Sequence, residues 1–260
     1  MTSPSSDTLA RTLAESRRRN LPPVAAFKWL GEGWRDLMVQ PSLSLAYGFA
    51  LFLVSIALIW VLFAFGLDYI LFPLVAGFMV VGPLVAIGLY EKSRRIDERQ
   101  RATLKDMLFV KAASGAQVLF IGVLLCLLML LWMRAAVIIY ALFFGLTPFP
   151  GLDHVASMLF TTHTGWAMLL VGMAVGGLFA AFSFAISVFA IPMLLHKRTD
   201  AFTAMGTSIS LVWNNLQVML VWGAIVLVLF LFCLFTGLLG MIVVFPLLGH
   251  ATWRAYKAMR

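Results

Sequence analysis

The stretch LLWMRAAVIIYALFFG, Leu130–Gly145, lies in a segment that carries a single charge, Arg134, between Lys111 and Asp153. A membrane-spanning helix needs about 20 predominantly apolar residues, and this segment supplies more than that. The stretch therefore predicts a helix that crosses a membrane. Arg134 then lies either inside the membrane as a functional charge or at the membrane's edge. The topology of the whole chain helps to decide between these two positions.

The composition of the chain also indicates a membrane protein. Of its 260 residues, 62% are hydrophobic and only 12% are charged, whereas soluble domains are typically about 25% charged. The net charge of +8 would indicate nucleic-acid binding in a soluble protein, but here the basic residues flank apolar runs, as the positive-inside rule predicts. We expect the lipid bilayer as partner, with anionic lipid at the cytoplasmic face, and no nucleic acid.

Apolar segments long enough to cross a bilayer recur six times along the chain. They lie near Leu45–Phe65, Tyr69–Tyr90, Ala113–Met133, Trp166–Leu195, Leu216–Phe235 and Gly237–Trp253. The sequence therefore predicts an all-α fold, a polytopic membrane helical bundle with about six transmembrane helices. Residues 1–23, rich in Ser, Thr and Arg, are expected to form a disordered cytoplasmic tail, and residues 24–260 the six-span integral membrane domain.

The basic residues set the orientation of these spans. All 19 Lys and Arg residues except Arg134 fall on one side of the six-span arrangement. Because Lys and Arg are enriched in cytoplasmic loops, both termini are predicted to be cytoplasmic. The turn that follows Thr236 is then expected on the outer side.

The orientation places Arg134 near the outer surface. From Lys111 to Arg134 the chain advances 23 residues, which is about 34 Å of helix and close to the thickness of the hydrocarbon core. An arginine there can extend to lipid phosphates as an anchor. The alternative is a functional charge paired with Asp68 or Asp153, the two acids expected on the same side.

Three similar arrangements recur along the chain. The amphipathic segments RDLMVQPS, LKDMLFVKAAS and SISLVWNNLQ each precede a span, and VVGPLVAIGLYEK, VFAIPMLLHKR and VVFPLLGHATWRAYK each place a proline shortly before a basic exit. This pattern leads to the hypothesis of three repeated helical hairpins with interfacial helices. In the stretch FKWLGEGWRDLMVQ (Phe27–Gln40), Trp29 and Trp34 are expected to act as headgroup anchors.

The fourth span carries small residues at helical spacing. They form two adjacent ridges, one of Gly172, Gly176 and Ala180 and the other of Gly177, Ala181 and Ala185. Such ridges let helix backbones approach closely, so this span is predicted to be central, and Gly176→Leu or Gly177→Leu to destabilise more than Gly48→Leu. Ser183 and Ser187 could hydrogen-bond to neighbouring helices or line a narrow polar path.

Few residues in the spans could carry chemistry. His250 lies in the sixth predicted span near its cytoplasmic exit, where it could be a structural hydrogen-bonding residue or a functional one. His154 and His163 lie in the outer segment 135–165, and their spacing does not define a ligand set. Cys126 and Cys233 both lie in spans and are expected to be packing residues. We therefore expect no metal and no cofactor.

Several stretches resemble a known family. They are VVGPLVAIGLY (Val80–Tyr90), LLWMRAAVIIYALFFG, FAISVFAIPMLLHKRTDAFTAMGTSISLVWNN (Phe184–Asn215) and LLGHATWRAYK (Leu247–Lys257). They are similar to a bacterial family of predicted six-span integral membrane proteins classified as a domain of unknown function, DUF2189. The resemblance implies a multi-pass protein of the bacterial inner membrane and no particular chemistry.

Two classes of function remain from the sequence. The chain lacks phosphate-binding, metalloprotease and serine-nucleophile motifs, so we expect that it is not an enzyme. The first hypothesis is a non-catalytic structural or accessory component of a membrane complex, with a membrane-protein partner. The second is a channel or transporter for a small neutral or amphipathic solute, which the glycine-rich helices and the prolines within the spans would serve.

Overall fold

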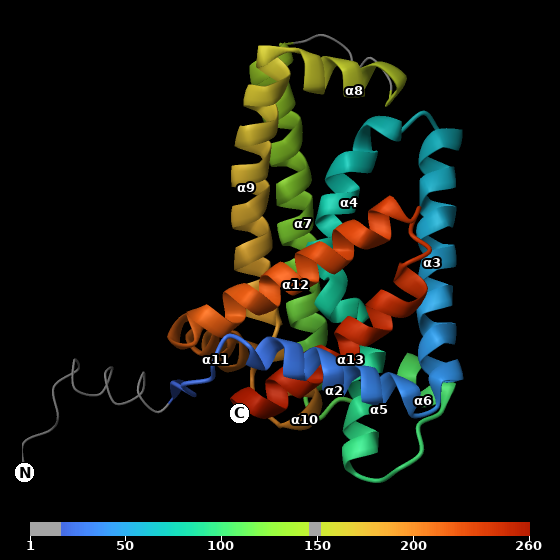
Figure 1. Cartoon of the computed structure of the whole chain (residues 1–260), viewed down its shortest axis with the longest axis vertical. Coiled ribbons are helices and arrows are strands. Elements are labelled where there is room, and N and C mark those ends of the chain that lie inside the picture. Colours follow the sequence, from blue (N-terminus) through green and yellow to red (C-terminus); the bar gives the residue numbers. More distant parts are fainter. Residues whose placement is uncertain (1–16, 146–151) are drawn as a thin grey trace, which may run out of the picture. The chain divides into compact units, whose positions relative to one another are not determined.

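The structure is a computed structural model that describes residues 17–145 and 152–260 (Figure 1). In those ranges every regular element is a helix, as the sequence predicts. The helices are α2 (Ala25–Met38), α3 (Pro41–Ala64), η1 (Asp68–Ile70), α4 (Leu71–Val85), α5 (Ile87–Asp97), α6 (Leu104–Leu108), α7 (Gly115–Phe144), α8 (Leu152–Thr161), α9 (His163–Ser187), α10 (Ala190–His196), α11 (Ala201–Asn214), α12 (Leu216–Phe235) and α13 (Met241–Met259).

Five helical segments of the described chain are long and apolar enough to cross a membrane. They are Pro41–Ala64, Asp68–Asp97, Gly115–Phe144, His163–His196 and Leu216–Phe235. These segments coincide with the first five predicted spans. The sixth predicted span falls on α13, which is not among the five because its second half carries Arg254 and Lys257.

Two of the five segments are interrupted near their ends. Ala86 separates α4 from α5, and residues 188–189 separate α9 from α10. Pro83 lies inside α4, where it lacks the N–H group that would continue the helical hydrogen bonding and its ring crowds the preceding turn. Pro192 lies in the first turn of α10, where the missing N–H is tolerated.

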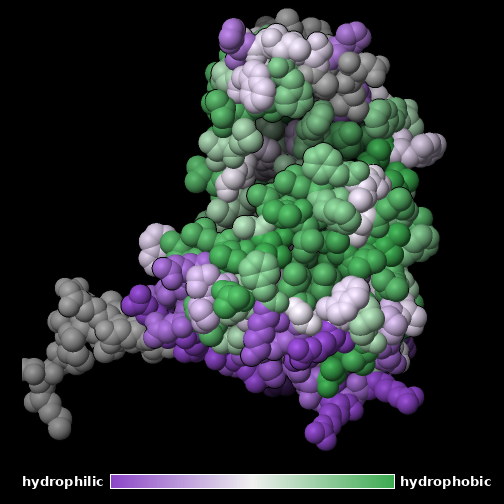
Figure 2. Space-filling view, viewed as in Figure 1, coloured by the Kyte–Doolittle hydropathy of each residue, from purple (hydrophilic) through white to green (hydrophobic). Residues whose placement is uncertain are grey.

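The contacts divide the chain into two compact units. Unit 1 comprises the described part of 1–52 together with 86–118 and 185–260, and unit 2 comprises 53–85 and 119–184, apart from the undescribed 146–151. Figure 2 shows hydrophilic side chains gathered over one end of unit 1, where α2 and the last turns of α13 lie, and hydrophobic side chains over α12.

Unit 1 is built around three helices that contact one another, α5, α10 and α13. Each is also contacted by an amphipathic helix, since α6 packs on α5, α11 packs on α10, and α2 packs on α13. The last of these contacts joins the first described helix to the final one and closes a ring (Figure 1). Each of the three amphipathic helices therefore packs on a different one of the three central helices.

Helix α2 buries the face that meets α13. Ala26, Trp29, Gly33 and Leu37 are buried at helical spacing, and a Cβ atom at Gly33 would collide with the backbone of Ala251. The Trp29 ring is 2% exposed and lies edge-on to Trp222 of α12. The sequence-based assignment of Trp29 as a headgroup anchor is therefore wrong, whereas Trp34 is 46% exposed.

Helices α12 and α13 form a hairpin. The start of α12 and the end of α13 lie close to each other. Asn215 Oδ1 accepts a hydrogen bond from Arg19 N (2.8 Å), and its Nδ2 donates to Arg17 O (3.0 Å). The Arg19 side chain donates to Met259 O (3.1 Å). The described start of the chain and its end therefore lie on the same face of unit 1. Arg17 and Arg19, predicted to belong to a disordered tail, make ordered contacts, and residues 1–16 lie outside the described chain.

The tip of this hairpin packs near the start of α3. A Cβ atom at Gly48 would collide with the carbonyl of Ile242, so the two backbones nearly touch there. Gly48 is seven residues from the beginning of α3, about 10 Å along a helix whose 24 residues extend about 36 Å. This corrects the expectation that Gly48 stands apart, because Gly48 lies in a close helix contact.

Unit 2 holds α7 against α4 and α9. Trp132 Nε1 donates a hydrogen bond to Pro73 O (3.0 Å), and a Cβ atom at Gly176 would lie 2.9 Å from the Trp132 ring. Gly172 and Gly177 have open space around them, and Ala181 is exposed. Adjacent positions on a helix point about 100° apart, so the ridge of Gly177 and Ala181 turns away from the Gly176 contact. We therefore keep the expectation of close helix packing for Gly176 and drop it for Gly177 and Ala181.

Candidate functional site: a buried polar network and a basic pocket

A buried histidine lies at the centre of a polar network in unit 1. His250 on α13 is fully buried, with Ser44 Oγ 2.8 Å from its Nε2 and Ser93 Oγ 2.8 Å from its Nδ1. Ser44 belongs to the first turn of α3, and Ser93 belongs to α5. One imidazole therefore joins three helices by side-chain hydrogen bonds.

The network has a defined direction. Lys92 Nζ, also fully buried, donates to Ser44 Oγ (2.6 Å) and to Gln40 O (3.1 Å). Because an ammonium group only donates, the Ser44 hydroxyl is free to donate its own proton to His250 Nε2. At the other end Ser93 Oγ donates to Asp36 (2.8 Å), so it accepts from His250 Nδ1. The network runs from a cation to an anion through one imidazole protonated on Nδ1.

The surroundings of His250 keep its ring neutral. Burial, and to a smaller extent the positive charges of Lys92 and Arg254, lowers the pKa of His250 to about 3. Only a neutral ring can accept from Ser44 while it donates to Ser93. The electrostatics and the hydrogen-bond pattern therefore agree.

Asp36 connects this hydrogen-bond network to a second set of charged side chains. Arg254 holds Asp36 with two guanidinium nitrogens, Nε at 2.8 Å and Nη2, and donates from Nη1 to Asp97 (2.7 Å). Asp97 also accepts from Trp253 Nε1 (2.9 Å) and pairs with Lys257 Nζ (3.2 Å). The network thus links α2, α3, α5 and α13, and its two carboxylates are engaged by two basic side chains, Arg254 and Lys257.

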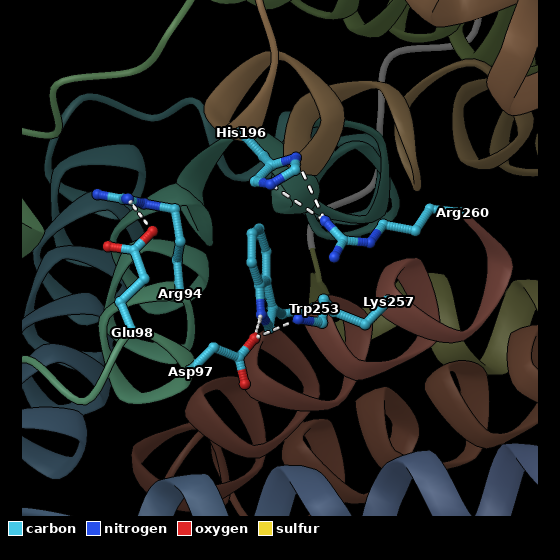
Figure 3. A pocket seen from close by; sticks show the side chains of 7 residues that line it. All are labelled: Arg94, Asp97, Glu98, His196, Trp253, Lys257 and Arg260. Carbon is cyan, nitrogen blue, oxygen red and sulfur yellow. Dashed lines mark hydrogen bonds and ion pairs between the residues drawn. The ribbon is translucent and has the colours of Figure 1, made fainter.

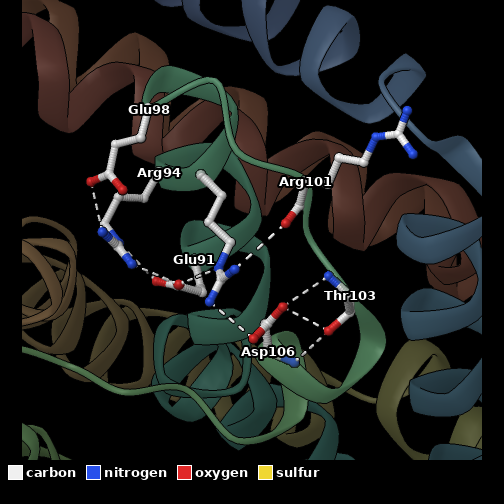
Figure 4. Close-up of polar contacts among 7 residues, drawn as sticks. Glu91, Arg94, Glu98, Arg101, Thr103 and Asp106 are labelled. Atoms are coloured by element: carbon white, nitrogen blue, oxygen red, sulfur yellow. Dashed lines mark hydrogen bonds and ion pairs between the residues drawn. The ribbon is translucent and has the colours of Figure 1, made fainter.

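A further cluster of charges joins α5 to α6 (Figure 4). Glu91, 2% exposed, accepts from both Arg94 and Arg95, and Arg95 also reaches Asp106 (2.9 Å). Asp106 and Thr103 form the capping box that begins α6. The hydrogen bond from the Thr103 hydroxyl lowers the pKa of Asp106, so that carboxylate is ionised at neutral pH. The cluster fixes the short helix α6 onto α5.

A pocket lies between α5, α10 and α13 (Figure 3). Its volume is about 210 Å³, and it is lined by Arg94, Asp97, Glu98, His196, Trp253, Lys257 and Arg260. In Figure 3, Trp253 and Lys257 both reach Asp97, Arg94 reaches Glu98, and Arg260 reaches the His196 ring. Three basic side chains and two carboxylates therefore face one small space.

Only some of the residues singled out from the sequence belong to this site. His250 is at its centre. Ser183 is buried on α9 and donates to Ala180 O of its own helix (3.0 Å), and Ser187 is fully buried near the end of α9. Neither belongs to the network described above.

Arg134 does not belong to the site either. It is exposed on α7, which continues ten residues beyond it to Phe144. Among the described residues no ion pair joins Arg134 to Asp68, and the Asp153 side chain lies outside the described part. His154 and His163 are exposed, on α8 and at the first residue of α9.

The other network residues were not identified from the sequence. One pair does carry a signal, because His250 and Arg254 are spaced by four residues on α13. Polar residues at that spacing share a helix face, which marks a side turned toward a polar neighbour. Lys92 directly follows the apolar stretch of its span and was interpreted only as a topology signal.

The similarity to a known family lies in the middle of the chain. Residues 71–196 match DUF2189, described as predicted integral membrane protein. No curated protein and no solved structure matches the chain. The DUF2189 segment runs from α4 to α10 and confirms the resemblance over that part. The network reaches beyond it, since Lys92, Ser93 and Asp97 lie inside the DUF2189 segment and Asp36, Ser44 and His250 lie outside.

Proposed function

We propose that this multi-pass membrane protein is a non-catalytic structural or accessory component of a complex in the bacterial inner membrane. The observation that carries the proposal is the hydrogen-bond chain from Lys92 through His250 to Asp36. Each side chain in this series hydrogen-bonds to the next one, and the series connects four helices. A fully satisfied buried polar network favours one rigid arrangement, as a scaffold requires.

The orientation forms part of the proposal. The basic residues gather on the side where Arg19 meets Met259, and the positive-inside rule assigns such a side to the cytoplasm. Both termini would then be cytoplasmic. Reporter fusions at Glu98, Asp200 and Arg260 should read as internal and fusions at Asp68 and Asp153 as external. A reversed result at any of the first three positions contradicts this topology.

A second function is favoured by the two interrupted helices. Transporters commonly place solute sites where spanning helices are broken, and here breaks follow α4 and α9. A channel or transporter for a small neutral or amphipathic solute is therefore the alternative, and such a protein would have to move at these breaks.

Purification at native expression level in mild detergent distinguishes the two functions. The accessory role predicts a membrane-protein partner that co-purifies in fixed stoichiometry and is retained after crosslinking. A monodisperse chain that purifies alone, and whose melting temperature rises with one solute, contradicts the accessory role and supports transport. An Arg101→Gln protein serves as a control, because this exposed arginine lies outside the network and the pocket.

A further inference from the structure

The pocket between α5, α10 and α13 has its carboxylates already engaged. Asp97 accepts from Arg254 on one oxygen and from Trp253 on the other, where Lys257 also binds. Glu98 is paired with Arg94 at 2.7 Å. The negative charges that line the pocket are therefore used by neighbouring donors, and a cation entering the pocket would have to displace them.

Arg260 presents donors with no carboxylate opposite them. In the described residues its guanidinium contacts the His196 ring, with Nη1 3.1 Å from Nε2, and pairs with no acid. Arginine carries five N–H donors and lysine three, so Arg260 and Lys257 both retain donors for an incoming acceptor. Three cations against two carboxylates leave the residues that line the pocket with a net positive charge.

The size and position of the pocket limit which ligands it can bind. Its 210 Å³ is several times the roughly 30 Å³ that one water occupies, but is smaller than the about 300 Å³ at which sites for drug-sized ligands begin. His196 and Asp97 are the last residues of two candidate spans. A pocket at the ends of spanning helices lies at the depth of lipid headgroups, where basic pockets bind anionic lipid.

We propose that this pocket binds a phosphate group, with Arg260 and Lys257 as its main donors and the Trp253 and His196 rings as its walls. A phosphate has several charged oxygens, which match the planar fork of arginine and the point charge of lysine. The group could belong to an anionic lipid headgroup or to free phosphate. The proposal does not rest on the accessory function above.

Melting of the full chain in detergent tests the site. One arm adds inorganic phosphate at constant ionic strength, and the other adds phosphatidylglycerol, with phosphatidylcholine as the neutral lipid. The wild type is expected to melt higher in at least one arm. Arg260→Gln should raise the half-saturating concentration by about tenfold or more, the usual value of a charge-assisted hydrogen bond. Arg260→Lys should give an intermediate value, and Lys257→Gln a loss in the same direction.

Arg101→Gln is the matched control, because it removes the same charge from an exposed position outside the pocket. Its binding should equal that of the wild type. A response to phosphate alone assigns the site to free phosphate, and a response only to the anionic lipid assigns it to a headgroup. The proposal is overturned if Arg260→Gln binds as well as Arg101→Gln, or if neither addition raises the melting temperature of the wild type.

Discussion

At the scale of single residues, His250 makes stability depend on pH. Its pKa in the fold is about 3, below the ordinary value of 6.5, so at pH 5 the unfolded chain binds a proton that the folded chain does not. Stability is therefore greatest above pH 6.5 and falls as the pH drops toward 3, by up to about 1.4 kcal/mol per pH unit. Thermal melts in detergent between pH 7 and pH 5 should show this slope.

His250→Gln is the matched variant for that slope. Glutamine keeps one donor and one acceptor but does not titrate. It should melt earlier than the wild type at pH 7 and change less between pH 7 and pH 5. The exposed carboxylates with lowered pKa, Asp106 and Asp200, titrate below this window. Equal slopes in the two proteins would show that His250 does not control the pH dependence.

The pairing of Asp36 with Arg254 yields a second test at this scale. Asp36 is 3% exposed, so Asp36→Asn leaves a buried guanidinium without one of its carboxylates and should cost about 3–5 kcal/mol of unfolding free energy. Glu32→Gln on the same helix breaks only the Lys28 pair, in which Lys28 is 77% exposed, and should cost about 0–1 kcal/mol. Comparable losses in the two variants, measured by detergent-compatible unfolding, would mean that the Asp36 pair is not what stabilises unit 1.

At the scale of helices, substitution of glycine by alanine tests which helix–helix contacts are close. Gly48→Ala places a Cβ atom against the Ile242 carbonyl, a backbone atom that cannot rotate away, so it should lower the melting temperature strongly. Gly177→Ala meets open space and gains helix propensity, worth up to about 1 kcal/mol, so it should be neutral or stabilising. If Gly177→Ala is the more harmful of the two, the assigned helix contacts are incorrect.

The depth of the α12–α13 hairpin can be measured directly. In a protein with Cys126 and Cys233 replaced, a cysteine at Leu238 in the hairpin turn should not react with a membrane-impermeant maleimide added from outside. The reason is that the tip packs about 10 Å along α3, short of a full crossing. A cysteine at Leu67, in the turn that follows α3, is the accessible control. Labelling of Leu238 as fast as Leu67 would show that the hairpin crosses the membrane.

At the scale of the whole molecule, hydropathy was enough to predict the fold class and five of the apolar segments. Bilayer thickness dictates that signal, and it is local in the sequence. The sixth predicted segment, on α13, is not among those five, although its first half, Met241–Leu248, is strongly apolar. Its position is set by tertiary contacts, in which Ser44 and Ser93 hold His250.

The site was harder to predict than the spans. Lys92 and Arg254 satisfy the positive-inside rule whether or not they are buried, so their positions in the sequence do not show that they have buried partners. Asp36 and His250 are more than 200 residues apart, and Gly33 is as far from Ala251. Helix pairing in membranes depends on small residues and shape, which no period along the chain records.

The packing of α2 against α13 has a consequence for synthesis. Met38 leaves the ribosome 221 residues before Met259, which at about 5–20 residues per second is roughly 11–44 s. During that interval α2 has no α13 to cover its apolar face, and Asp36 has no Arg254 beside it. The apolar face of the first described helix therefore stays uncovered by its partner until the last described helix has been synthesised.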